Sequence, residues 1–458
     1  MNTIRTAGLF CLFITLIHNA TYAQKVSNVM PKEIKQLIDK ASDSLSHYYV
    51  NLEMGNQIGQ HLKKQELSGA FNGIIHPDSL AKKITQELRS VNGDLHLYLM
   101  YRPIKKERNK PQNIVRTKPL NYGLTELKIL ENNIGYLKIQ SFSNWDYYHE
   151  TRSVISSAMK LLEDTNAIIF DVRDNRGGVP KLVAFLISHL FPPKQVHLAE
   201  YTHRYQNSSY GLYTETYIPG KRLPDIPVYV LVNKSSASAA EEFAYFLKHQ
   251  QRATIVGEVT AGAGYGAMWH RLNDRFVISI SSEEDINPVT KSNFEKVGVQ
   301  PQIKVSSKEA LEVAEKLAKE AAKQYAKSKE IRQKNLRKEF NNITSNSEIL
   351  EIERILRACQ KETLINLNDI NNLGYRFLQN QPKIAEVIFK MNIEFYPMYS
   401  NVYDSYGDAL AENKKLHEAR QNYQKAVELG EKEQSRYLNV YKENLKKVEK
   451  LLKKKTEP

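Results

Sequence analysis

The chain has 458 residues, of which 41% are apolar and 25% charged, and its formal net charge is +14. A chain of this length is expected to fold as two or three domains, and its apolar content is sufficient for packed cores. The basic residues are interleaved with Glu in stretches such as 308–339, which is typical of an ion-paired, solvated helix face. No basic segment of the sequence is interleaved with aromatic residues, so the positive charge does not indicate a nucleic-acid-binding protein.

The first residues of the sequence have the pattern of a secretory signal peptide. Arg5 precedes an uncharged apolar run at 7–17, and the small residues of Ala20–Ala23 predict cleavage after Ala23. The apolar run is too short to span a bilayer, and no later segment of the sequence qualifies as transmembrane. We therefore expect an exported protein, in the periplasm or outside the cell. One of the two cysteines lies in this segment, so cleavage leaves only Cys359 and no intrachain disulfide.

Residues 24–90 are expected to form an N-terminal helical domain. Apolar residues recur there with the 3.6-residue period of a helix. They are Ile34, Leu37, Ile38 and Ala41 in one stretch and Leu80, Ile84 and Leu88 in another. Beyond this domain, Leu95, Leu97 and Leu99 alternate with other residues, which predicts a strand that points His96 away from the leucines. The polar segment Pro103–Pro119 is expected to be a loop.

An α/β core is expected over residues 91–305. Apolar, β-branched runs predict buried strands, and two amphipathic stretches between them predict helices. The strands are Ile134–Ile139, Ala167–Val172, Val228–Val232, Thr254–Gly257 and Arg275–Ile280, and the helices are Tyr148–Glu163 and Lys181–Leu190. Val154, Ala158 and Leu161 should form the inward face of the first helix. Strands that alternate with helices predict a mostly parallel sheet covered by helices.

The last part of the chain is expected to be entirely helical. A charged helical linker at 306–345 leads into a repeat region at 346–458, where glycine, small and aromatic residues recur after about 34 residues, as in tetratricopeptide helix pairs. The recurring pairs are Gly374 and Gly407, Ala385 and Ala419, and Phe389 and Tyr423. The pattern covers about two repeats, fewer than a stable array needs, so flanking helices should cap it. Such repeats are a candidate docking site for a protein partner.

The stretch Val228–Glu242 joins a predicted strand to a predicted helix through a turn that contains Ser238. An abrupt turn of this kind lifts a side chain clear of the sheet edge and places it beside the unpaired N–H groups at the positive end of the helix dipole. A hydroxyl nucleophile needs such donors, because negative charge develops during acyl transfer. The same residues also fit a helix-capping box, since Glu241 lies three positions after Ser238.

Two glycine-bearing turns follow predicted strands. Arg176-Gly177-Gly178 comes after the strand that has Asp171 near its end, and Gly262–Gly266 comes after Thr254–Gly257. Glycine lets backbone N–H groups approach a ligand closely, although a tight structural turn is the alternative. The second turn lacks the spacing of a dinucleotide-binding fingerprint.

A serine nucleophile needs a base, and the base usually needs an orienting acid. His249 lies about 16 Å further along the helix that follows Ser238, too far for direct proton transfer. His96 and His270 remain as candidate bases, and each also fits an ordinary packed or solvated histidine. The candidate acids, each of which also fits a surface carboxylate, are Glu283, Glu284, Asp285 and Glu295.

Five segments in this order resemble the S41 serine peptidases, which include the C-terminal processing peptidases, the tricorn protease core and the interphotoreceptor retinoid-binding protein. They lie at 133–139, 170–178, 236–244, 252–260 and 298–301. The helical segment 26–90, which is followed by the sequence Asn-Gly-Asp-Leu-His-Leu, is similar to the N-terminal domain of the retinoid-binding-protein branch. Together the resemblance covers about residues 30–305. It implies a mixed α/β fold with a crotonase/Clp-like core, preceded by the helical domain and followed by the all-α tetratricopeptide-like segment.

The resemblance also implies site residues. Ser238 matches the nucleophile of the family, and the backbone N–H of Ala239 together with that of Gly177 or Gly178 matches its oxyanion hole. The processing peptidases use a lysine base at a position that Ala263 occupies here, so a Ser–Lys dyad is not supported.

The tricorn-like branch instead uses a histidine from before the sheet and a glutamate just before a Gly-Val-x-Pro segment. His96 and Glu295 match those two positions. Gln302 stands where the family usually has Asp, and the space between the His96 strand and Ile134 is too short for the PDZ domain that reads substrate tails and that the processing peptidases insert there. The C-terminal repeats are a candidate replacement for that domain.

The function that the resemblance implies is that of an exported serine endopeptidase with a Ser238–His96–Glu295 triad, acting on peptide or unfolded-protein substrates without a metal or organic cofactor. The retinoid-binding relatives supply an alternative, a catalytically idle binding protein for a hydrophobic ligand or peptide. In a third interpretation the protein acts mainly through its repeats, and the core is a scaffold for partner binding.

Overall fold

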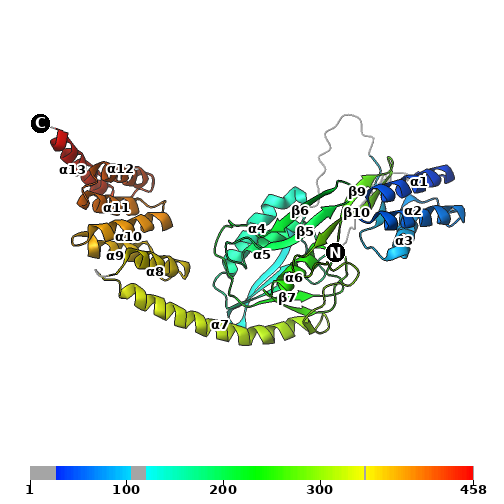
Figure 1. Cartoon of the computed structure of the whole chain (residues 1–458), viewed down its shortest axis with the longest axis horizontal. Helices are drawn as coiled ribbons and strands as arrows, with labels where there is room; N and C mark the ends of the chain where they lie inside the picture. The colour runs from blue at the N-terminus through cyan, green and yellow to red at the C-terminus, as the bar shows by residue number, and fades with distance from the viewer. Residues whose placement is uncertain (1–26, 105–119, 345–346, 457–458) are drawn as a thin grey trace, which may run out of the picture. The chain divides into compact units, whose positions relative to one another are not determined.

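The structure is a computed structural model that describes residues 27–104, 120–344 and 347–456 (Figure 1). The predicted signal peptide and nearly all of the predicted loop Pro103–Pro119 lie outside the described residues. The chain divides into two compact units. The first comprises Met1–Thr117, His197–Tyr213 and Thr260–Val299, and the second comprises Lys118–Val196, Thr214–Val259 and Gln300–Pro458. Within the described ranges, no helix combines the length and the apolar character needed to cross a membrane.

Among its described residues, the first unit contains three helices and an antiparallel sheet. The helices are α1 (Pro31–Tyr48), α2 (Leu52–Leu67) and α3 (Pro77–Asn92). The described strands of the sheet are β1 (Tyr98–Tyr101), β5 (His197–His203), β6 (Ser208–Tyr213), β9 (Tyr265–Arg271) and β10 (Phe276–Ile286). The order is β1-β10-β5-β6, and β9 pairs with β10 as well. The sequence predicted the helices and parts of β1 and β10, but neither β5, β6 nor β9.

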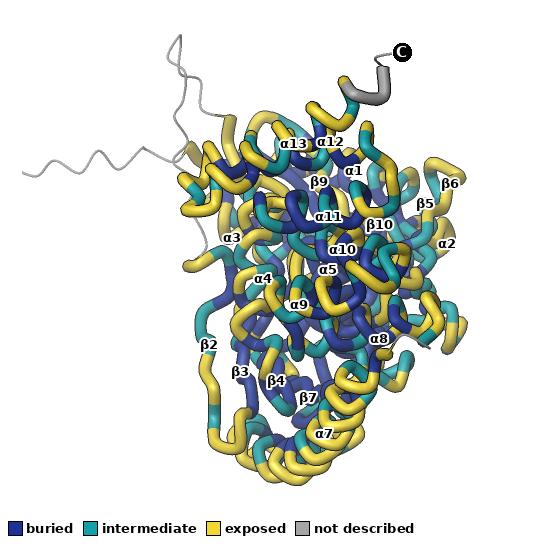
Figure 2. The backbone as a smooth tube through the Cα atoms, turned by 90° about the vertical axis from the view of Figure 1, so that its left-hand side faces the viewer, coloured by how far each residue is buried: buried dark blue, intermediate teal, exposed yellow. Residues whose placement is uncertain are grey.

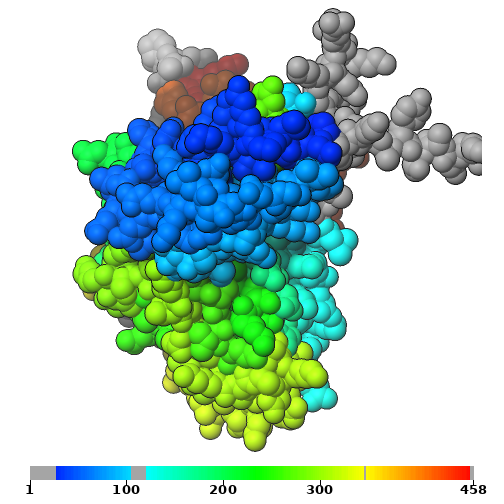
Figure 3. Space-filling view, turned by 90° about the vertical axis from the view of Figure 1, so that its right-hand side faces the viewer, coloured from blue at the N-terminus to red at the C-terminus, as the bar shows by residue number. Residues whose placement is uncertain are grey.

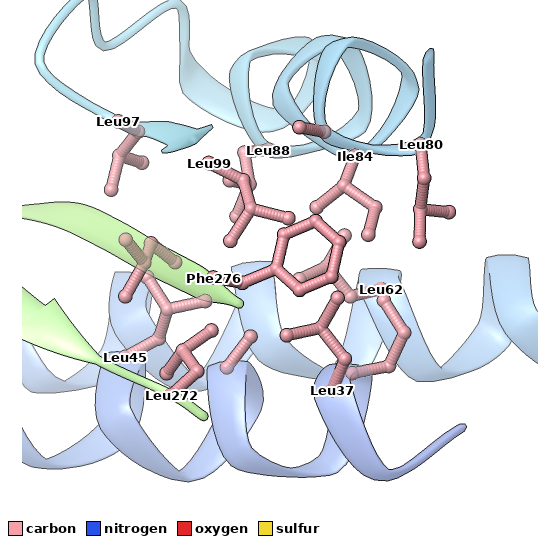
Figure 4. Close-up of a cluster of buried hydrophobic side chains, with 14 of the residues drawn as sticks. Leu37, Leu45, Leu62, Leu80, Ile84, Leu88, Leu97, Leu99, Leu272 and Phe276 are labelled. Atoms are coloured by element: carbon pink, nitrogen blue, oxygen red, sulfur yellow. The ribbon is translucent and has the colours of Figure 1, made fainter. Parts of the chain in front are cut away.

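The helices of the first unit pack on the sheet through one hydrophobic cluster. Figure 4 shows Leu37, Leu45 and Leu62 from α1 and α2 facing Ile84 and Leu88 from α3, and Phe276 from the sheet lies among them. The apolar residues that share a helical face in the sequence are the residues buried in this cluster, so their period was read correctly. The outer sides of the same helices form the blue part of the surface in Figure 3.

The second unit is built around a mostly parallel sheet. Its described strands are β2 (Leu124–Leu130), β3 (Ile134–Ile139), β4 (Ala167–Asp171), β7 (Val228–Val232), β8 (Thr254–Gly257) and β11 (Ile303–Lys304), in the order β11-β8-β7-β4-β3-β2. Only the β2–β3 pair is antiparallel among these neighbours. The strands β4 and β7 are buried along their whole length, as the predicted continuous apolar runs require (Figure 2).

Helices cover both faces of this sheet. The helices nearest the site are α4 (Tyr148–Leu162), α5 (Pro180–Ser188) and α6 (Ala239–His249), and the long helix α7 (Ala310–Asn341) packs on the sheet through an alanine stripe at Ala310, Ala314, Ala318 and Ala322. Neighbouring residues of β4 point to opposite faces: Ile169 belongs to the cluster with α7, whereas Phe170 meets Phe243 of α6 with ring centroids 5.3 Å apart.

The predicted inward face of α4 was partly wrong. Ala158 is buried as expected, but Ile155 and Leu162 are buried with it, and Leu161 is 67% exposed. The buried stripe of α4 therefore lies one residue position away from the predicted one. Apolar residues of α4 itself lie on more than one side of the helix, so the sequence pattern alone did not define its buried side.

The C-terminal helices pack as successive neighbours (Figure 1). They are α8 (Ile349–Lys361), α9 (Leu367–Leu378), α10 (Pro382–Phe395), α11 (Ser400–Glu412), α12 (Leu416–Lys432) and α13 (Leu438–Thr456). The predicted repeat corresponds to a repeated contact. A Cβ atom on Gly374 would lie 2.4 Å from the Phe389 ring, and one on Gly407 would lie 2.6 Å from the Tyr423 ring, so both glycines permit close packing of an aromatic side chain.

Candidate active site

Ser238 occupies the turn between β7 and α6 in the second unit, at the first residue before the helix. Its backbone has φ 54° and ψ −125°, a conformation that residues other than glycine rarely adopt. Such strain persists only where the surrounding structure holds it, and it is concentrated at functional sites. The Ser238 side chain is half-buried, in contrast to its buried neighbours Ala237 and Ala239. The turn therefore presents one partly accessible hydroxyl at the end of a buried strand.

The predicted helix-capping interaction is formed at the same residue. The backbone N–H of Ser238 donates to Oε2 of Glu241 at 2.9 Å, and Glu241 is fully buried. Glu241 therefore fixes the position of Ser238 relative to the first turn of α6. This contact with Glu241 engages the main chain of Ser238, so it leaves the hydroxyl proton available for a chemical role.

A second turn, between β4 and α5, is attached to the Ser238 turn through Asn175. The carbonyl oxygen of Asn175 accepts the N–H of Ala237 at 2.9 Å, and its side chain accepts the N–H of Gly177 at 2.8 Å and donates to the carbonyl of Ile139 at 2.9 Å. Asn175 is fully buried. Asn175 was not among the residues predicted for the site, although its position directly before Arg176-Gly177-Gly178 was a signal.

Gly177 lies against Ser238 so closely that no larger residue fits. Its φ is +99°, and a Cβ atom there would lie 2.8 Å from Cβ of Ser238 and 3.0 Å from the backbone nitrogen of Ala239. Glycine is required for both reasons, the left-handed conformation and the close approach. The structure therefore brings together Ser238, Ala239 and the glycine turn, all of which belong to the second unit.

The backbone donors of the two turns differ in what they bind. The N–H of Gly177 is engaged by Asn175, as described above. The N–H groups of Gly178 and Ala239 have no acceptor in the part of the chain that the structure describes. Ala239 is the first residue of α6, where the helix dipole is positive and the N–H groups lack helical partners.

Buried polar contacts hold the glycine turn on the sheet. Asp171 at the end of β4 is fully buried, accepts the hydroxyl of Tyr136 at 2.7 Å and pairs with Arg173, whose Nη2 lies 2.6 Å from its Oδ2. The carbonyl of Gly177 accepts the N–H of Phe142 at 2.9 Å. The turn is therefore fixed from the sheet and from the segment after β3.

His96 belongs to the first unit and lies in a turn rather than on a strand, which corrects the predicted strand Leu95–Met100. The strand β1 begins only at Tyr98, because the carboxylate of Asp94 accepts the backbone N–H of His96 at 2.9 Å and closes a turn before it. Leu97 and Leu99 are buried, whereas Leu95 is 40% exposed, so the predicted alternation of leucines holds only from Leu97 onward.

The His96 ring is half-buried, and burial lowers the pKa of the ring below its usual value. The negative charge of Asp94 acts in the opposite direction, and Arg89 lowers the pKa further. Its Nδ1 atom is buried and has no hydrogen-bond partner among the described residues. The structure therefore does not form a hydrogen bond between Nδ1 of His96 and Glu295.

Glu295 also belongs to the first unit, where it holds the loop that contains Ala263. Its Oε2 atom accepts the N–H of Gly264 at 2.8 Å. Burial, followed by the negative charges of Glu284, Glu295 and Asp94, raises the pKa of Tyr265 to about 12. Ala263 is buried and carries no ionisable group, so this position cannot supply a base.

The other histidines and acids named from the sequence lie in different surroundings. The ring of His270 stacks on Tyr48 of α1 with centroids 3.9 Å apart, and His249 packs edge-on against Tyr245. Glu283 binds Nε2 of His203 at 2.9 Å. Of the other two acids, Asp285 is buried and Glu284 is half-buried, and burial raises the pKa of Glu284.

Comparison with known protein families identifies two matching regions. Residues 133–305 match the model of peptidase family S41, and residues 21–127 match the N-terminal domain of peptidase S41 in eukaryotic IRBP. The first match contains the Ser238 turn and the glycine turn, and the second contains His96. The resemblance to S41 peptidases is confirmed.

The similar curated proteins are processing proteases. Over 171 residues the chain is 31% identical to the carboxyl-terminal-processing protease of Synechocystis, which covers 37% of each protein. It is 29% identical over 190 residues to the carboxy-terminal processing protease CtpA of Bacillus subtilis, covering 41% of this chain and 38% of the relative. The chain therefore matches well under half the length of these relatives. Among solved structures, the photosystem II D1 C-terminal processing protease aligns over 60% of this chain and 93% of its own, with 14% identity and a TM-score of 0.41.

Proposed function

Because the chain carries a peptidase family S41 domain at residues 133–305, we propose that this protein is an exported serine endopeptidase that hydrolyses peptide bonds in peptides or unfolded proteins. The observation that carries the proposal is the strained, half-buried Ser238 in contact with Gly177 at the start of α6. A strained turn between a strand and a helix is how α/β hydrolases expose a nucleophilic serine. The size of the core and the covered sheet suit a crotonase/Clp-like fold.

In the proposed mechanism, Oγ of Ser238 attacks the peptide carbonyl carbon, and Nε2 of His96 accepts the hydroxyl proton. The histidine then donates that proton to the departing amine, and a water molecule repeats both steps to release the acyl group. Burial lowers the pKa of His96, which keeps the ring neutral and able to accept a proton near neutral pH. Glu295 is the proposed partner of the imidazolium, and their hydrogen bond would form when substrate is bound.

The proposed oxyanion donors are the backbone N–H groups of Ala239 and the glycine turn. Within that turn we assign the role to Gly178, because the N–H of Gly177 already binds the side chain of Asn175. The role of Gly177 is then to let the turn approach Ser238. Two such donors in a site that excludes water stabilise the tetrahedral intermediate, and the loss of one costs about 10²–10³ in kcat in other enzymes.

The predictions about location and about the repeats remain proposals. The signal-peptide pattern that ends at Ala23 supports export to the periplasm or beyond. The matching Gly374–Phe389 and Gly407–Tyr423 contacts support tetratricopeptide-like pairs in α9–α12, which would bind a protein partner. No metal or organic cofactor is required by the proposed mechanism.

The test is hydrolysis of an unfolded protein substrate by Ser238→Ala. We expect kcat/KM to fall by about 10⁴–10⁶-fold, with a comparable loss for His96→Ala and a smaller loss for Glu295→Gln. Ser235→Ala is the matched control, because Ser235 lies in the same turn and is also half-buried. Unchanged hydrolysis by the Ser238 variant would overturn the proposal, and a purified protein that cleaves nothing but retains an apolar ligand would favour the binding-protein alternative.

A further inference from the structure

A buried carboxylate lies two residues before His96. Asp94 is completely buried, and both of its oxygens are occupied by neutral donors. Oδ1 accepts the backbone N–H of His96 at 2.9 Å, and Oδ2 accepts the hydroxyl of Tyr49 at 2.9 Å. A carboxylate in this position is costly to bury, because its charge is removed from water without an ion pair. The free-energy cost of burying this carboxylate suggests that Asp94 has a functional role.

The contacts of Asp94 extend into the helices of the first unit. Nδ2 of Asn92, the last residue of α3, donates to the Tyr49 hydroxyl at 2.7 Å, and Oδ1 of Asn92 accepts the N–H of Asp94 at 3.2 Å. Tyr49 is the capping residue directly after α1, and it is buried. The turn that carries His96 is thus tied by side chains to the ends of two helices.

The other side of the same turn is anchored by packing. Figure 4 shows Leu97 and Leu99 pointing into the hydrophobic cluster formed by α1, α2 and α3. Arg89 adds a polar anchor, since its Nε donates to the carbonyl of Leu97 at 2.9 Å. The backbone on both sides of His96 is therefore fixed, whereas Nδ1 of its ring has no partner among the described residues.

The charge of Asp94 has a predictable effect on a protonated ring. A negative charge held in a low-dielectric environment favours the charged form of a nearby base. Burial of the His96 ring disfavours the imidazolium and so lowers the pKa of the ring. Asp94 favours the imidazolium, and the positive charge of Arg89 disfavours it. Asp94 therefore supplies, within the described residues, a negative charge that stabilises the imidazolium formed during proton transfer.

We propose that Asp94 is a positioning residue for His96, which fixes the main chain of the base and supplies the negative charge that the imidazolium needs. This inference rests on the proposed function, in which His96 is the base. The role differs from that of Glu295, because Asp94 acts through the backbone N–H of His96 and through its charge, and makes no hydrogen bond to the ring. Tyr49 and Asn92 hold the carboxylate in place.

The experiment is the pH dependence of kcat/KM for Asp94→Asn in the full chain, beside wild type and His96→Ala. Asparagine keeps an acceptor for the His96 N–H and removes the charge. We expect kcat to fall about 10-fold with little change in KM, and the acid limb of the profile to move about one unit to lower pH. Asp94→Glu keeps the negative charge but moves it. This variant should therefore lose activity, while the acid limb of its pH profile stays at the wild-type pH. Asp43→Asn on α1 is the control, because Asp43 is an exposed carboxylate of the same unit.

A second measurement does not depend on activity. The rate at which diethylpyrocarbonate modifies His96, followed by peptide mass spectrometry across pH, reports the pKa of the ring directly. A lower pKa in Asp94→Asn supports the inference. A kcat and an acid limb equal to those of wild type, with His96→Ala inactive, would overturn the inference and leave the proposed function intact, whereas an active His96→Ala would overturn both. If Asp94→Asn does not fold, the kcat of Tyr49→Phe tests the inference instead, because this variant removes the hydroxyl that binds Asp94. An unchanged kcat in Tyr49→Phe would contradict a role for the contacts that hold Asp94.

Discussion

The carbonyl oxygen of Asn175 accepts the N–H of Ala237 at 2.9 Å, so the turn after β4 and the turn after β7 are joined directly before the strained residue Ser238. The strands β4 and β7 are parallel neighbours, with Asp171 opposite Leu231. Their carboxyl ends therefore meet at the same edge of the sheet. The position of Ser238 relative to the glycine turn follows from this pairing and from the hydrogen bonds that join Asn175 to Ala237, Gly177 and Ile139.

Asn175→Ala should destabilise the second unit and impair the glycine turn. The substitution leaves the buried carbonyl of Ile139 without its donor and the N–H of Gly177 without its acceptor. Each unsatisfied buried group costs about 1–3 kcal/mol. We expect the free energy of unfolding, measured by urea denaturation, to fall by about 2–5 kcal/mol, and kcat to fall more than KM rises. Asn335→Ala, at an exposed residue of α7 in the same unit, is the control, and equal stability of the two variants would contradict the structural role of Asn175.

Gly177→Ala should abolish activity, and Gly220→Ala should not. Both glycines have positive φ, +99° and +89°, so alanine is strained by about 1–2 kcal/mol at either position. At Gly220 no atom lies within 4 Å of the added Cβ, whereas at Gly177 the added atom meets Ser238, Ala237 and Ala239. The comparison of hydrolysis rates and melting temperatures separates backbone strain from the clash. Equal effects of the two substitutions would show that the close approach of Gly177 to Ser238 does not matter.

The sequence patterns were sufficient for the elements that carry Ser238. The run Val228–Val232 is β7 with the predicted bounds, and the helix predicted after the Ser238 turn is α6. The continuous apolar run of β7 matches its complete burial, whereas α6 is buried on every side from Ala239 to Leu247, polar residues included. The contact between Gly177 and Ser238 also follows from the predicted parallel order, because both turns leave the same edge of one sheet.

Other features could not be predicted, because they depend on contacts between distant parts of the chain. The antiparallel sheet of the first unit pairs β10 with β5, more than seventy positions earlier in the chain, and residues such as Ser208–Tyr213 lack a regular apolar pattern. His96 lies in a turn because of the side chain of Asp94, and alternation of leucines gave no sign of it. The role of Asn175 was missed for the same reason, since an asparagine before glycines is common in ordinary turns.

His189 should make the protein less stable in mild acid. Burial lowers the pKa of this histidine to about 4, and the side chain is 1% exposed. The unfolded state binds a proton near the ordinary pKa of about 6.5 and the folded state only near 4, so stability is lost as the pH falls between these values. The loss from this residue is about 3 kcal/mol. Urea denaturation of wild type and His189→Gln at pH 7.5 and 4.5 should give a smaller pH effect in the variant, and an equal effect in both proteins would contradict the prediction.

Asp404 in α11 should have the opposite pH dependence. Burial, followed by the negative charge of Asp408, raises the pKa of Asp404 to about 7. Because its carboxylate ionises more easily in the unfolded state, stability falls as the pH rises from about 4 to about 7. Asp404→Asn should therefore slow hydrogen exchange in α11 at pH 8 and have little effect at pH 4. Asp408→Asn is the contrasting variant, because both carboxylate oxygens of Asp408 accept a hydroxyl, one from Tyr375 and one from Tyr423. Asparagine replaces one of these acceptor oxygens by an NH₂ group, so this variant should not gain stability. Faster exchange in Asp404→Asn at pH 8 would contradict this account.

The most direct test of the proposed function is covalent labelling of the wild-type protein with a fluorophosphonate, followed by peptide mass spectrometry and by assay of protein hydrolysis. An activated serine reacts with this reagent because its oxygen attacks phosphorus while backbone donors hold the new oxyanion. The account predicts one adduct per chain, on Ser238, with hydrolysis lost in proportion to labelling and no adduct on Ser235. Full hydrolytic activity in a protein that carries the label on Ser238, or activity with no label at all, would contradict it.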